Sequence, residues 1–574
     1  MVTAATFAQG YLVLGSRKGV IVVLKQGDSG KYSAIITIEV QRDEAITSLL
    51  PLSNGDDQPH NYILSTCRDG RYRIHEIPTT GSQPNAILIH EILPPFVSSI
   101  EGAWFSDNGD GTKDLMLCGF RSSNLVVWNE TQRHEVAIVD CGGSSRSYAW
   151  TPLRYRHDGF RFVFTKAGQM HIFSQTCAPH KTLKPGGHGR EIKAVSASTG
   201  RYIATAAEDT VIRIWEYNDY DYQYNEQNNN DPRLRCIAAL ERHATGIQAL
   251  KWYKNEYLFS SGGNEEFFVW KINRLQCSNF SGLAVVCEAV FPDRTEVGDA
   301  RITDFDVTCT ARDSNGGYEF AISMVLSNST LQTYTYNRVS GFRLLRRSTY
   351  TGACLTQVRQ LDSNHVLTAA TDGYLAIYST TNPEAEGRSP GDPDAALTVT
   401  KLHQNTVKSL DVRQVFIQDD GASEYLIVTG GDDNALGVTH IRVSPTPISS
   451  ASSSESRRGA TTITIKSKSL VRSAHAAAIT GVAFAHVGED SALVVTGSND
   501  QRVKIWRLLG WQQQQQQARA QLLDERYSSV ADAGDLDVFG GWDGDGEGNE
   551  TDKGKGKKKV IVVGVGLEIW EVEV

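Results

Sequence analysis

One set of three positions recurs along this chain at a fixed spacing. Its clearest copy is Thr496, Asp500 and Trp506: a hydroxyl, an acid four residues later, and an indole six residues after the acid. Six more copies keep this spacing while varying the residue types: Thr205, Asp209, Trp215; Ser260, Asn264, Trp270; Thr368, Asp372, Tyr378; Ser65, Asp69, His75; Thr429, Asp433, Thr439; and Cys118, Ser122, Trp128. Seven copies in one phase are hard to obtain by chance, and they indicate an architecture of stacked repeats.

Residues 475–510 contain one whole unit. An apolar-alternating run at 479–485 is followed, after a polar turn, by a β-rich run at 492–496 and a third run at 503–508. Three short strands separated by turns within one repeat predict the blade of a propeller or another stacked array. The unit resembles a WD repeat, so the predicted fold class is all-β, a WD-repeat β-propeller.

The residue types predict a buried chain of hydrogen bonds. An indole N–H only donates, so a buried Trp506 needs an acceptor such as the Thr496 hydroxyl, while Asp500 accepts from His475. A His, Ser/Thr and Asp also form hydrolase triads, but here the hydroxyl lies within a strand and is bonded to Trp. We therefore interpret three sets as structural tetrads: His475, Thr496, Asp500, Trp506; His188, Thr205, Asp209, Trp215; and His243, Ser260, Asn264, Trp270.

Composition narrows the class of protein. The nine cysteines are scattered, and no pair has metal-ligand spacing, so we expect reduced thiols and no metal site. No apolar run approaches the roughly 20 residues that cross a bilayer, and no signal peptide is evident, which favours a cytoplasmic protein without a membrane partner. The net charge of -9 argues against general coating of nucleic acid.

The order of the runs predicts two domains. Residues 1–177 read as a partial propeller of about four blades, in which the chain starts mid-blade, with the second and third strands at 11–26. Residues 178–187 read as a linker or a closing strand. Residues 188–574 read as a seven-bladed ring, a size within the usual range for propellers. Its blades are expected to begin near His188, His243, Arg301, Ala353, His403, His475 and Tyr527. The last blade is expected to stop after its third strand, with the outer strand lent by residues 170–173 or 180–183.

Four polar inserts interrupt the ring and are predicted to be disordered, at 218–231, 445–459, 512–517 and 540–559. The lysine-rich run at 553–559 has two interpretations, a contact with RNA or a solvated loop tip.

Motifs for catalysis are missing from the sequence. The glycines at 564 and 566 follow an apolar strand, as in the nucleotide loop of methyltransferases, but such a loop needs a following helix and a βαβ sheet, and only eight residues follow Gly566. The sequence has no GxxxxGK[ST], HExxH or GxSxG motif. We therefore predict no enzyme activity and no cofactor.

A more specific resemblance lies in residues 242–272, with their Gly-Gly, acidic pair and Phe-Phe-Val-Trp run, and in the segments 529–539 and 564–572. These segments resemble the WD repeat-containing protein 6 family, whose members are longer and contain more than one propeller, so the chain looks like their C-terminal portion. The resemblance implies a non-catalytic scaffold that docks a tRNA ribose 2′-O-methyltransferase and helps position tRNA for methylation of the wobble nucleotide. The alternative is a protein–protein adaptor unrelated to RNA modification, because the repeat architecture supports many functions.

Two groups of charged residues are candidate binding sites. Loops at one end of a propeller are the usual place for recognition, and they are expected to hold a partner face made of Arg190, Glu191, Arg242, Glu265 and Glu266. The alternative is that these charges only solvate the rim. A second group, Arg343, Arg346 and Arg347 on an outer strand, is the candidate contact for RNA phosphate.

Overall fold

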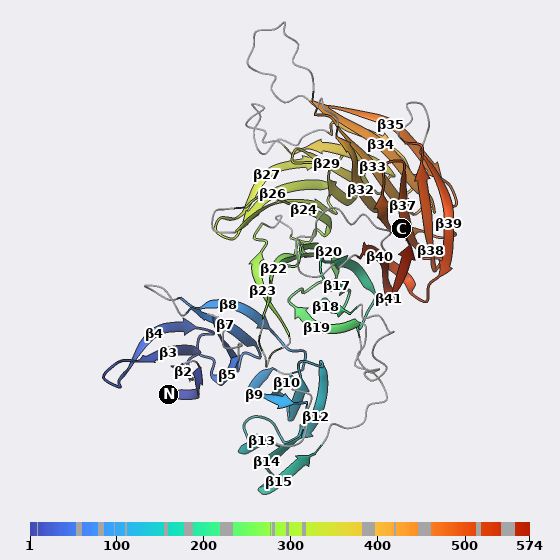
Figure 1. Cartoon of the computed structure of the whole chain (residues 1–574). Helices are drawn as coiled ribbons and strands as arrows, with labels where there is room; N and C mark the ends of the chain where they lie inside the picture. The colour runs from blue at the N-terminus through green and yellow to red at the C-terminus, as the bar shows by residue number, and fades with distance from the viewer. Residues whose placement is uncertain are drawn as a thin grey trace, which may run out of the picture. The chain divides into compact units, whose positions relative to one another are not determined.

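The structure is a computed structural model of the whole chain (Figure 1). In the part of the chain that it describes, every regular element is a β-strand. The structure describes residues 1–573 except 9, 53–59, 79–84, 97, 109–111, 154–158, 177–186, 219–233, 276, 278–279, 281, 294–297, 313–316, 381–395, 418–420, 446–460, 512–517 and 541–556. The predicted inserts fall almost wholly within these gaps, as does the candidate closing strand at 180–183. No helix among the described residues is long and apolar enough to span a membrane.

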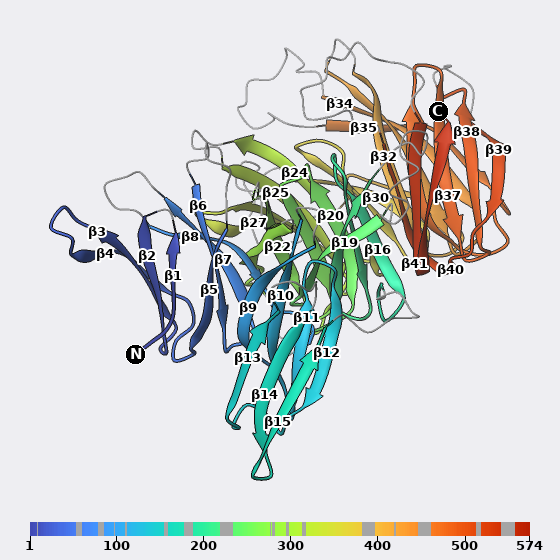
Figure 2. The same cartoon turned by 60° about the horizontal axis from the view of Figure 1, so that its bottom comes forward.

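The strands of the described residues form eleven antiparallel sheets, each built from consecutive strands. Nine sheets have four strands, β13–β15 has three, and β40–β41 has two. The first four sheets contain β1 (Val2–Ala8), β2 (Tyr11–Ser16), β3 (Val20–Gln26), β4 (Tyr32–Glu39); β5 (Ile46–Leu52), β6 (His60–Cys67), β7 (Tyr72–Pro78), β8 (Ile87–Ile92); β9 (Ser99–Asp107), β10 (Lys113–Arg121), β11 (Asn124–Asn129), β12 (His134–Asp140); and β13 (Tyr148–Pro152), β14 (Phe160–Lys166), β15 (Gln169–Gln175). Figure 2 shows β13, β14 and β15 as one small sheet.

Seven further sheets follow in the sequence. They contain β16 (Ile192–Ala197), β17 (Tyr202–Ala207), β18 (Val211–Tyr217), β19 (Leu234–Glu241); β20 (Ile247–Tyr253), β21 (Tyr257–Gly262), β22 (Phe267–Arg274), β23 (Leu283–Val290); β24 (Ile302–Arg312), β25 (Tyr318–Leu326), β26 (Thr330–Asn337), β27 (Gly341–Thr349); β28 (Leu355–Gln360), β29 (His365–Ala370), β30 (Tyr374–Ser379), β31 (Thr398–Lys401); β32 (Val407–Ile417), β33 (Ser423–Gly431), β34 (Leu436–Pro445), β35 (Thr461–Val471); β36 (Ile479–Val487), β37 (Ser491–Ser498), β38 (Arg502–Leu509), β39 (Arg519–Tyr527); and β40 (Ala531–Phe539), β41 (Lys557–Glu573). Four-stranded antiparallel sheets of this kind are typical of WD-repeat propeller blades.

The turn between the second and third strands explains the recurring acid. In the hairpin of β37 and β38, the carboxylate of Asp500 accepts the amide N–H of Arg502 at 2.9 Å, and Gln501 between them has a positive φ of 58°. Asp209 and Asp69 bond the amide two residues on in the same way. A short acidic side chain stabilises such a turn by accepting a hydrogen bond from the backbone two residues later. The position of the acid in the repeat therefore follows from the turn itself.

The core lies between neighbouring sheets. One apolar cluster joins Leu426 and Val428 of β33 to Val482 of β36 and to Trp506 of β38. Where a sheet is covered on two faces, its second strand is buried nearly throughout, as in β21, β29 and β33. Burial on both faces explains why these strands are apolar in almost every position.

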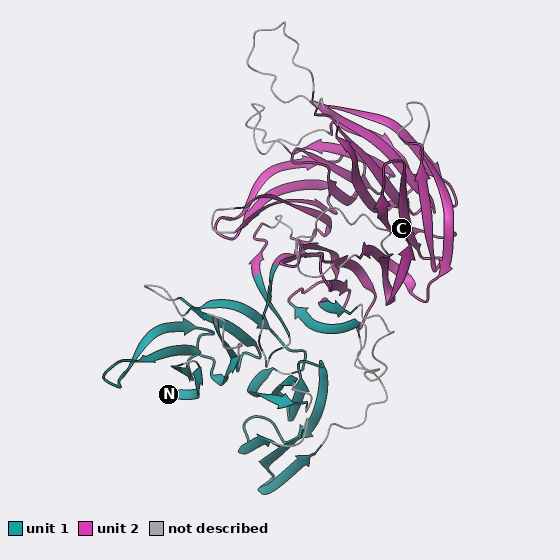
Figure 3. Cartoon of the chain, viewed as in Figure 1, with its two compact units in different colours: residues 1–187, 213–241, 270–287 teal, residues 188–212, 242–269, 288–574 magenta. Residues whose placement is uncertain are grey.

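The chain divides into two compact units (Figure 3). Unit 1 comprises residues 1–187, 213–241 and 270–287, and unit 2 comprises residues 188–212, 242–269 and 288–574. Within unit 2 the first strands of successive sheets contact each other in the order β16, β20, β24, β28, β32, β36 and β40, and β40 also contacts β16.

Two predictions for the ends of the chain were wrong. The first sheet does not start mid-blade, because β1 precedes β2 and pairs with it. In the last sheet, the run predicted as the third strand pairs directly with β40, from Phe539 opposite Lys559 to Ala531 opposite Val565. Residues 170–173 pair with β14 within their own sheet. An apolar run does not by itself reveal its pairing partner, which is why the sequence misassigned these strands.

Candidate functional site

The recurring polar set forms a continuous chain of hydrogen bonds in the sheet of β36–β39. Nε2 of His475 lies 2.8 Å from Oγ1 of Thr496, to which Nε1–H of Trp506 donates at 2.9 Å. Nδ1 of His475 lies 3.0 Å from a carboxylate oxygen of Asp500. A neutral imidazole with its proton on Nδ1 satisfies all four groups: Nδ1–H donates to the carboxylate, and the Thr496 hydroxyl donates to Nε2 while it accepts from the indole.

This geometry leaves no group free for catalysis. Thr496 is completely buried and His475 is 3% exposed, so the hydroxyl cannot meet a substrate. Burial lowers the pKa of His475 below its ordinary value, although Asp500 opposes that effect. Burial by itself would raise the pKa of Asp500, but the amide of Ala476, the imidazole and the amide of Arg502 together hold it below its usual value. The set therefore stabilises the sheet and anchors the loop that precedes it.

Two other copies have the same geometry. Nε2 of His188 lies 2.8 Å from the Thr205 hydroxyl, and Nδ1 lies 3.1 Å from the Asp209 carboxylate. Nε2 of His403 lies 2.8 Å from the Thr429 hydroxyl, with Nδ1 2.9 Å from Asp433.

The third predicted tetrad needs a correction. Nε2 of His243 contacts the hydroxyl of Ser260 at 2.8 Å, but Nδ1 lies 3.0 Å from Glu266 instead of Asn264. Glu266 also accepts the amide N–H of Ala244. Asn264 and Glu265 both have positive φ, and this turn brings the longer side chain two residues later to the position that Asp500 fills in the other copy.

The predicted partner face is only partly exposed. Glu265 is 2% exposed and Glu266 is 9% exposed, so neither is available to a partner, which corrects their assignment. Glu266 is buried because it belongs to the tetrad, where its carboxylate is the hydrogen-bond partner of the buried His243. Arg190 and Arg242 are exposed, and Glu191 is half-buried in an ion pair with Lys193 at 2.5 Å.

The three arginines of β27 also do not share one surface. Arg343 and Arg347 are exposed, whereas Arg346 is 5% exposed. Arg346 lies opposite Thr333, which is itself buried, while the bulge between Thr333 and Tyr334 shifts the register of the strand. The prediction that Arg346 contacts RNA is therefore wrong, because successive side chains of a strand point to opposite faces.

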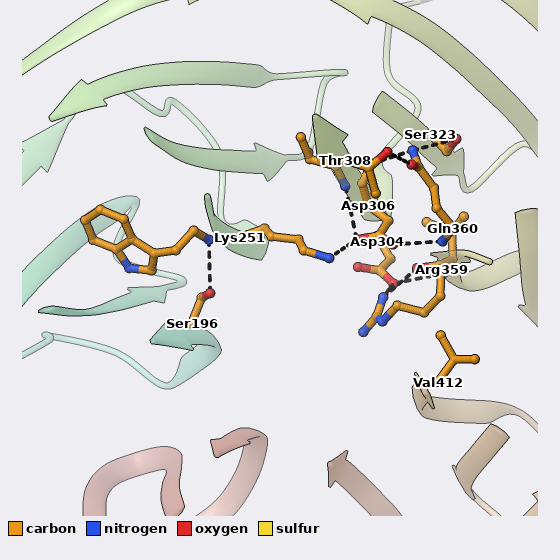
Figure 4. A network of polar contacts seen from close by, with 12 residues as sticks. Ser196, Lys251, Asp304, Asp306, Thr308, Ser323, Arg359, Gln360 and Val412 are labelled. Carbon is orange, nitrogen blue, oxygen red and sulfur yellow. Dashed lines mark hydrogen bonds and ion pairs between the residues drawn. The ribbon is translucent and has the colours of Figure 1, made fainter. Parts of the chain in front are cut away.

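A polar cavity of about 370 Å³ lies within unit 2. Its lining comes from seven strands, the first strand of each sheet from β16 to β40. Figure 4 shows a network of polar contacts around Asp304, Asp306 and Arg359. Among the described side chains, no group of three or more His, Cys, Asp or Glu is placed to hold a metal ion.

Aspartates in the cavity or directly beside it bond the backbone of the neighbouring first strand. Five such bonds join the strands: Asp304 accepts from the amide of Val358 at 2.9 Å, Asp306 from Gln360 at 2.7 Å, Asp411 from Phe484 at 2.9 Å, Asp535 from Val195 at 3.1 Å and Asp537 from Ala197 at 2.8 Å. Each bond crosses from one sheet to the next. The last two link β40 to β16, which are 340 residues apart in the sequence.

Cations neutralise several of these carboxylates. Arg359 donates to Asp304 at 2.6 Å, Arg413 donates to Asp411 at 2.9 Å, and the ammonium group of Lys251 contacts Asp306. Burial and the neighbouring Arg359 lower the pKa of Lys251 to about 8, although Asp304 and Asp411 oppose this effect.

The two carboxyl groups of β40 titrate differently from ordinary aspartates. Burial raises the pKa of Asp535 to about 7 and that of Asp537 to about 6, although the amides of Val195 and Ala197 oppose the effect. Sequence reasoning missed the whole set of cavity aspartates. Its signal was an acid in the first strand followed two residues later by a second charge, as at 304–306, 411–413 and 535–537.

A comparison with protein families agrees with this repeat structure. The family described as WD domain, G-beta repeat matches residues 178–216 and 467–507. The chain carries WD40 repeats. Proteins with such repeats are typically non-catalytic scaffolds. Among solved structures, the chain is similar to the crystal structure of RRP9 WD40 repeats, with 15% identity, a TM-score of 0.40, and coverage of 66% of this chain and 89% of the other.

The chain is also similar to curated proteins over part of its length. It is 28% identical over 137 residues to the tRNA (34-2'-O)-methyltransferase regulator WDR6 of Pongo abelii and to that of Homo sapiens, which covers 23% of this chain. The match spans only 11% of the length of those relatives. A ribosome biogenesis protein WDR12 homolog of Drosophila mojavensis is 22% identical over 204 residues, covering 33% of this chain and 44% of that protein.

Proposed function

We propose that this chain is a non-catalytic scaffold subunit that docks a tRNA ribose 2′-O-methyltransferase and helps position tRNA for methylation of the wobble nucleotide. The observation that carries the proposal is the 28% identity over 137 residues to proteins named as regulators of a tRNA (34-2'-O)-methyltransferase. The buried hydrogen-bond tetrads support a non-catalytic role, because their hydroxyl and imidazole groups serve the fold.

The same proposal includes a closed seven-bladed ring for the sheets from β16 to β41, preceded by about four blades. The contact of β40 with β16 and the bonds of Asp535 and Asp537 support the closure. A rigid ring suits a scaffold, because loops held by a stiff framework recognise partners without a large loss of conformational entropy.

Within this ring, the docking face for the enzyme consists of the exposed loop residues Arg190, Arg242, Gln404 and Asn405. Arg242 is held near the ring of Phe268 at 5.8 Å, which limits its freedom before a partner arrives. The contact with tRNA phosphate consists of Arg343 and Arg347, both exposed on β27.

Affinity purification of the full chain, combined with mapping of ribose methylation at nucleotide 34 of tRNA, tests the proposal. We expect a methyltransferase to co-purify and wobble methylation to fall in a deletion strain, with rescue by the parent chain. The double variant Arg190→Glu and Arg242→Glu is expected to lose the enzyme. The matched variant Arg507→Glu changes an exposed arginine on β38 and is expected to retain it. Unchanged methylation in the deletion strain would overturn the proposal.

The second candidate function is a protein–protein adaptor outside RNA modification. It is supported by the eleven sheets in the described part of the chain, which extend far beyond the 137 residues similar to the methyltransferase regulators. The identity of the co-purifying partners separates the two candidates. Partners without an RNA methyltransferase, together with normal wobble methylation, would favour the adaptor.

A further inference from the structure

The contact between β40 and β16, which we call the β40–β16 junction, joins strands that are far apart in the sequence (Figure 2). The other neighbouring first strands of unit 2 belong to sheets that follow one another along the chain, whereas these two are linked by residues 340 positions apart. The strands approach closely, because a Cβ atom added to Gly534 would overlap the carbonyl oxygen of Ile192. Side-chain bonds across the junction therefore help to hold it closed.

Two carboxyl groups make these bonds. Oδ2 of Asp535 accepts the N–H of Val195 at 3.1 Å, and Oδ2 of Asp537 accepts that of Ala197 at 2.8 Å. The other oxygen of each group accepts the N–H of the next residue in β40, at 2.8 Å and 2.7 Å. The two side chains are two positions apart in one strand, so they share a face and lie roughly 7 Å from each other. Among the described residues, neither carboxyl group takes part in an ion pair.

The corresponding aspartates at two other junctions have a different environment. The three that bond β28 and β36 each have a cationic partner from a neighbouring strand or from their own strand. A cation beside a carboxylate favours the ionised form, whereas burial without a cation favours the protonated form. The β40–β16 junction therefore differs from these two in how its carboxyl groups respond to protons.

The strands packed against β40 supply no ion-pair partner for the two aspartates among the described residues. Lys193 of β16 lines the cavity but is ion-paired with Glu191 at 2.5 Å. The side chains of β36 that line the cavity are uncharged, and Lys559 of β41 lies opposite Phe539. The remaining charged groups that line the cavity are Lys251, Asp304, Arg359, Lys408, Asp411 and Arg413.

We propose that the β40–β16 junction is sensitive to pH: it stays closed while Asp535 and Asp537 hold protons, and it loosens when both carboxyl groups are ionised. Ionisation places two negative charges on one face of β40 without a cation, and separation of the strands exposes both to water, where a charge is less costly.

The titration of the two groups places this change near neutral pH. Burial raises the pKa of Asp535 to about 7 and that of Asp537 to about 6. Both groups hold their protons more tightly in the closed junction than in water, where the pKa of an aspartate is 3.8. The protons therefore stabilise the closed junction fully below about pH 4, and this stabilisation is lost as the pH rises to about 7.

The junction lies close to the proposed docking face. β16 begins shortly after Arg190, so a looser junction leaves the loop that carries this arginine less firmly held. Docking of the enzyme is therefore expected to weaken as the pH rises. This consequence rests on the proposed function, whereas the pH response of the junction is tested without a partner.

Hydrogen–deuterium exchange of the full chain at about pH 5 and about pH 8, corrected for the intrinsic exchange rate, tests the proposal. We expect the β16 peptide to open at least about tenfold more at the higher pH, because each carboxyl group contributes up to about tenfold per pH unit. The β28 peptide is the internal control. Its amides at Val358 and Gln360 bond aspartates that have cationic partners, and they are expected to keep their protection at both pH values.

Two variants separate the junction from other effects of pH. The double variant Asp535→Asn and Asp537→Asn keeps an acceptor for each amide without a charge, and it is expected to protect β16 equally at both pH values. Gly534→Ala forces the strands apart and is expected to expose β16 at both. Circular dichroism melts establish that each variant is folded, and the comparison within the parent chain needs no variant.

Four results would each overturn the proposal. In the parent, these are equal protection of β16 at both pH values, or a loss of protection in β28 that parallels the loss in β16. In the variants, they are a double variant that still loosens at the higher pH, or a folded Gly534→Ala chain whose β16 is as protected as in the parent.

Discussion

Replacing Asp535 by asparagine is expected to stabilise the protein at alkaline pH. The carboxylate accepts the amide N–H of Val195 at 3.1 Å, and the side-chain oxygen of an asparagine accepts the same bond. Asp535→Asn therefore keeps the link between β40 and β16 while it removes a charge from the cavity. Burial raises the pKa of this carboxyl group from 3.8 to about 7, so ionisation costs free energy in the folded state.

The sign of the effect follows from proton binding. A carboxyl group with a higher pKa in the folded state holds its proton more tightly there than in the unfolded chain. Its contribution to stability is full below about pH 4 and is lost as the pH rises to about 7. The whole interval corresponds to about 4 kcal/mol at about 1.4 kcal/mol per pH unit. Because Asp535 is partly open to the cavity, we discount this figure and expect about 1–2 kcal/mol between pH 5 and pH 8.

Urea unfolding followed by circular dichroism at pH 5 and pH 8 measures the effect. The free energy of unfolding of Asp535→Asn, relative to that of the parent, is expected to be higher at pH 8 than at pH 5. Asp411→Asn is the matched control, because Asp411 bonds the amide of Phe484 in the same way but is paired with Arg413. Its substitution is expected to bring no gain at pH 8. An Asp535→Asn variant that is less stable than the parent by the same amount at both pH values would refute the reasoning.

Three further predictions concern the tetrads and the exposed arginines. Trp506→Ala is expected to lower the free energy of unfolding by about 3–5 kcal/mol, whereas Arg507→Ala on the same strand leaves it within about 0.5 kcal/mol; thermal melts that coincide would contradict this. Glu266→Ala is expected to lower the free energy of unfolding in urea by about 1–3 kcal/mol, because it leaves the buried His243 without its carboxylate partner. An equal loss in Asn264→Ala would show that the asparagine is the partner instead. Arg343→Glu is expected to weaken tRNA binding and flatten its salt dependence in a filter-binding assay, and an unchanged slope would exclude a phosphate contact there.

The hairpins were predictable because their contacts are local. The hydroxyl, acid and indole of the tetrad around Thr496 lie within one β-hairpin, and the spacing along the chain fixes which side chains face each other. The contact of His475 with Asp500 was predictable for the same reason, since His475 precedes the same sheet by a few residues. The third tetrad departed from the expectation because two consecutive positive φ angles, at Asn264 and Glu265, moved the acid to Glu266.

Burial and long-range pairing depended on the packing of the sheets. Arg346 and Glu265 look like exposed charges in the sequence, but the former lies on the buried side of a bulged strand and the latter in a turn closed by the tetrad. The bonds of Asp304, Asp411 and Asp535 cross between sheets over 54, 73 and 340 residues. A local pattern carries no information about a partner at such a distance.

The sequence alone therefore determined the repeat, the positions of most strands and the polar set within each hairpin, because neighbours in the chain create them. The tertiary arrangement determined which charges are buried and which carboxylates join one sheet to the next. These features depend on the surface that a neighbouring sheet presents, and that surface exists only when the sheets have packed together.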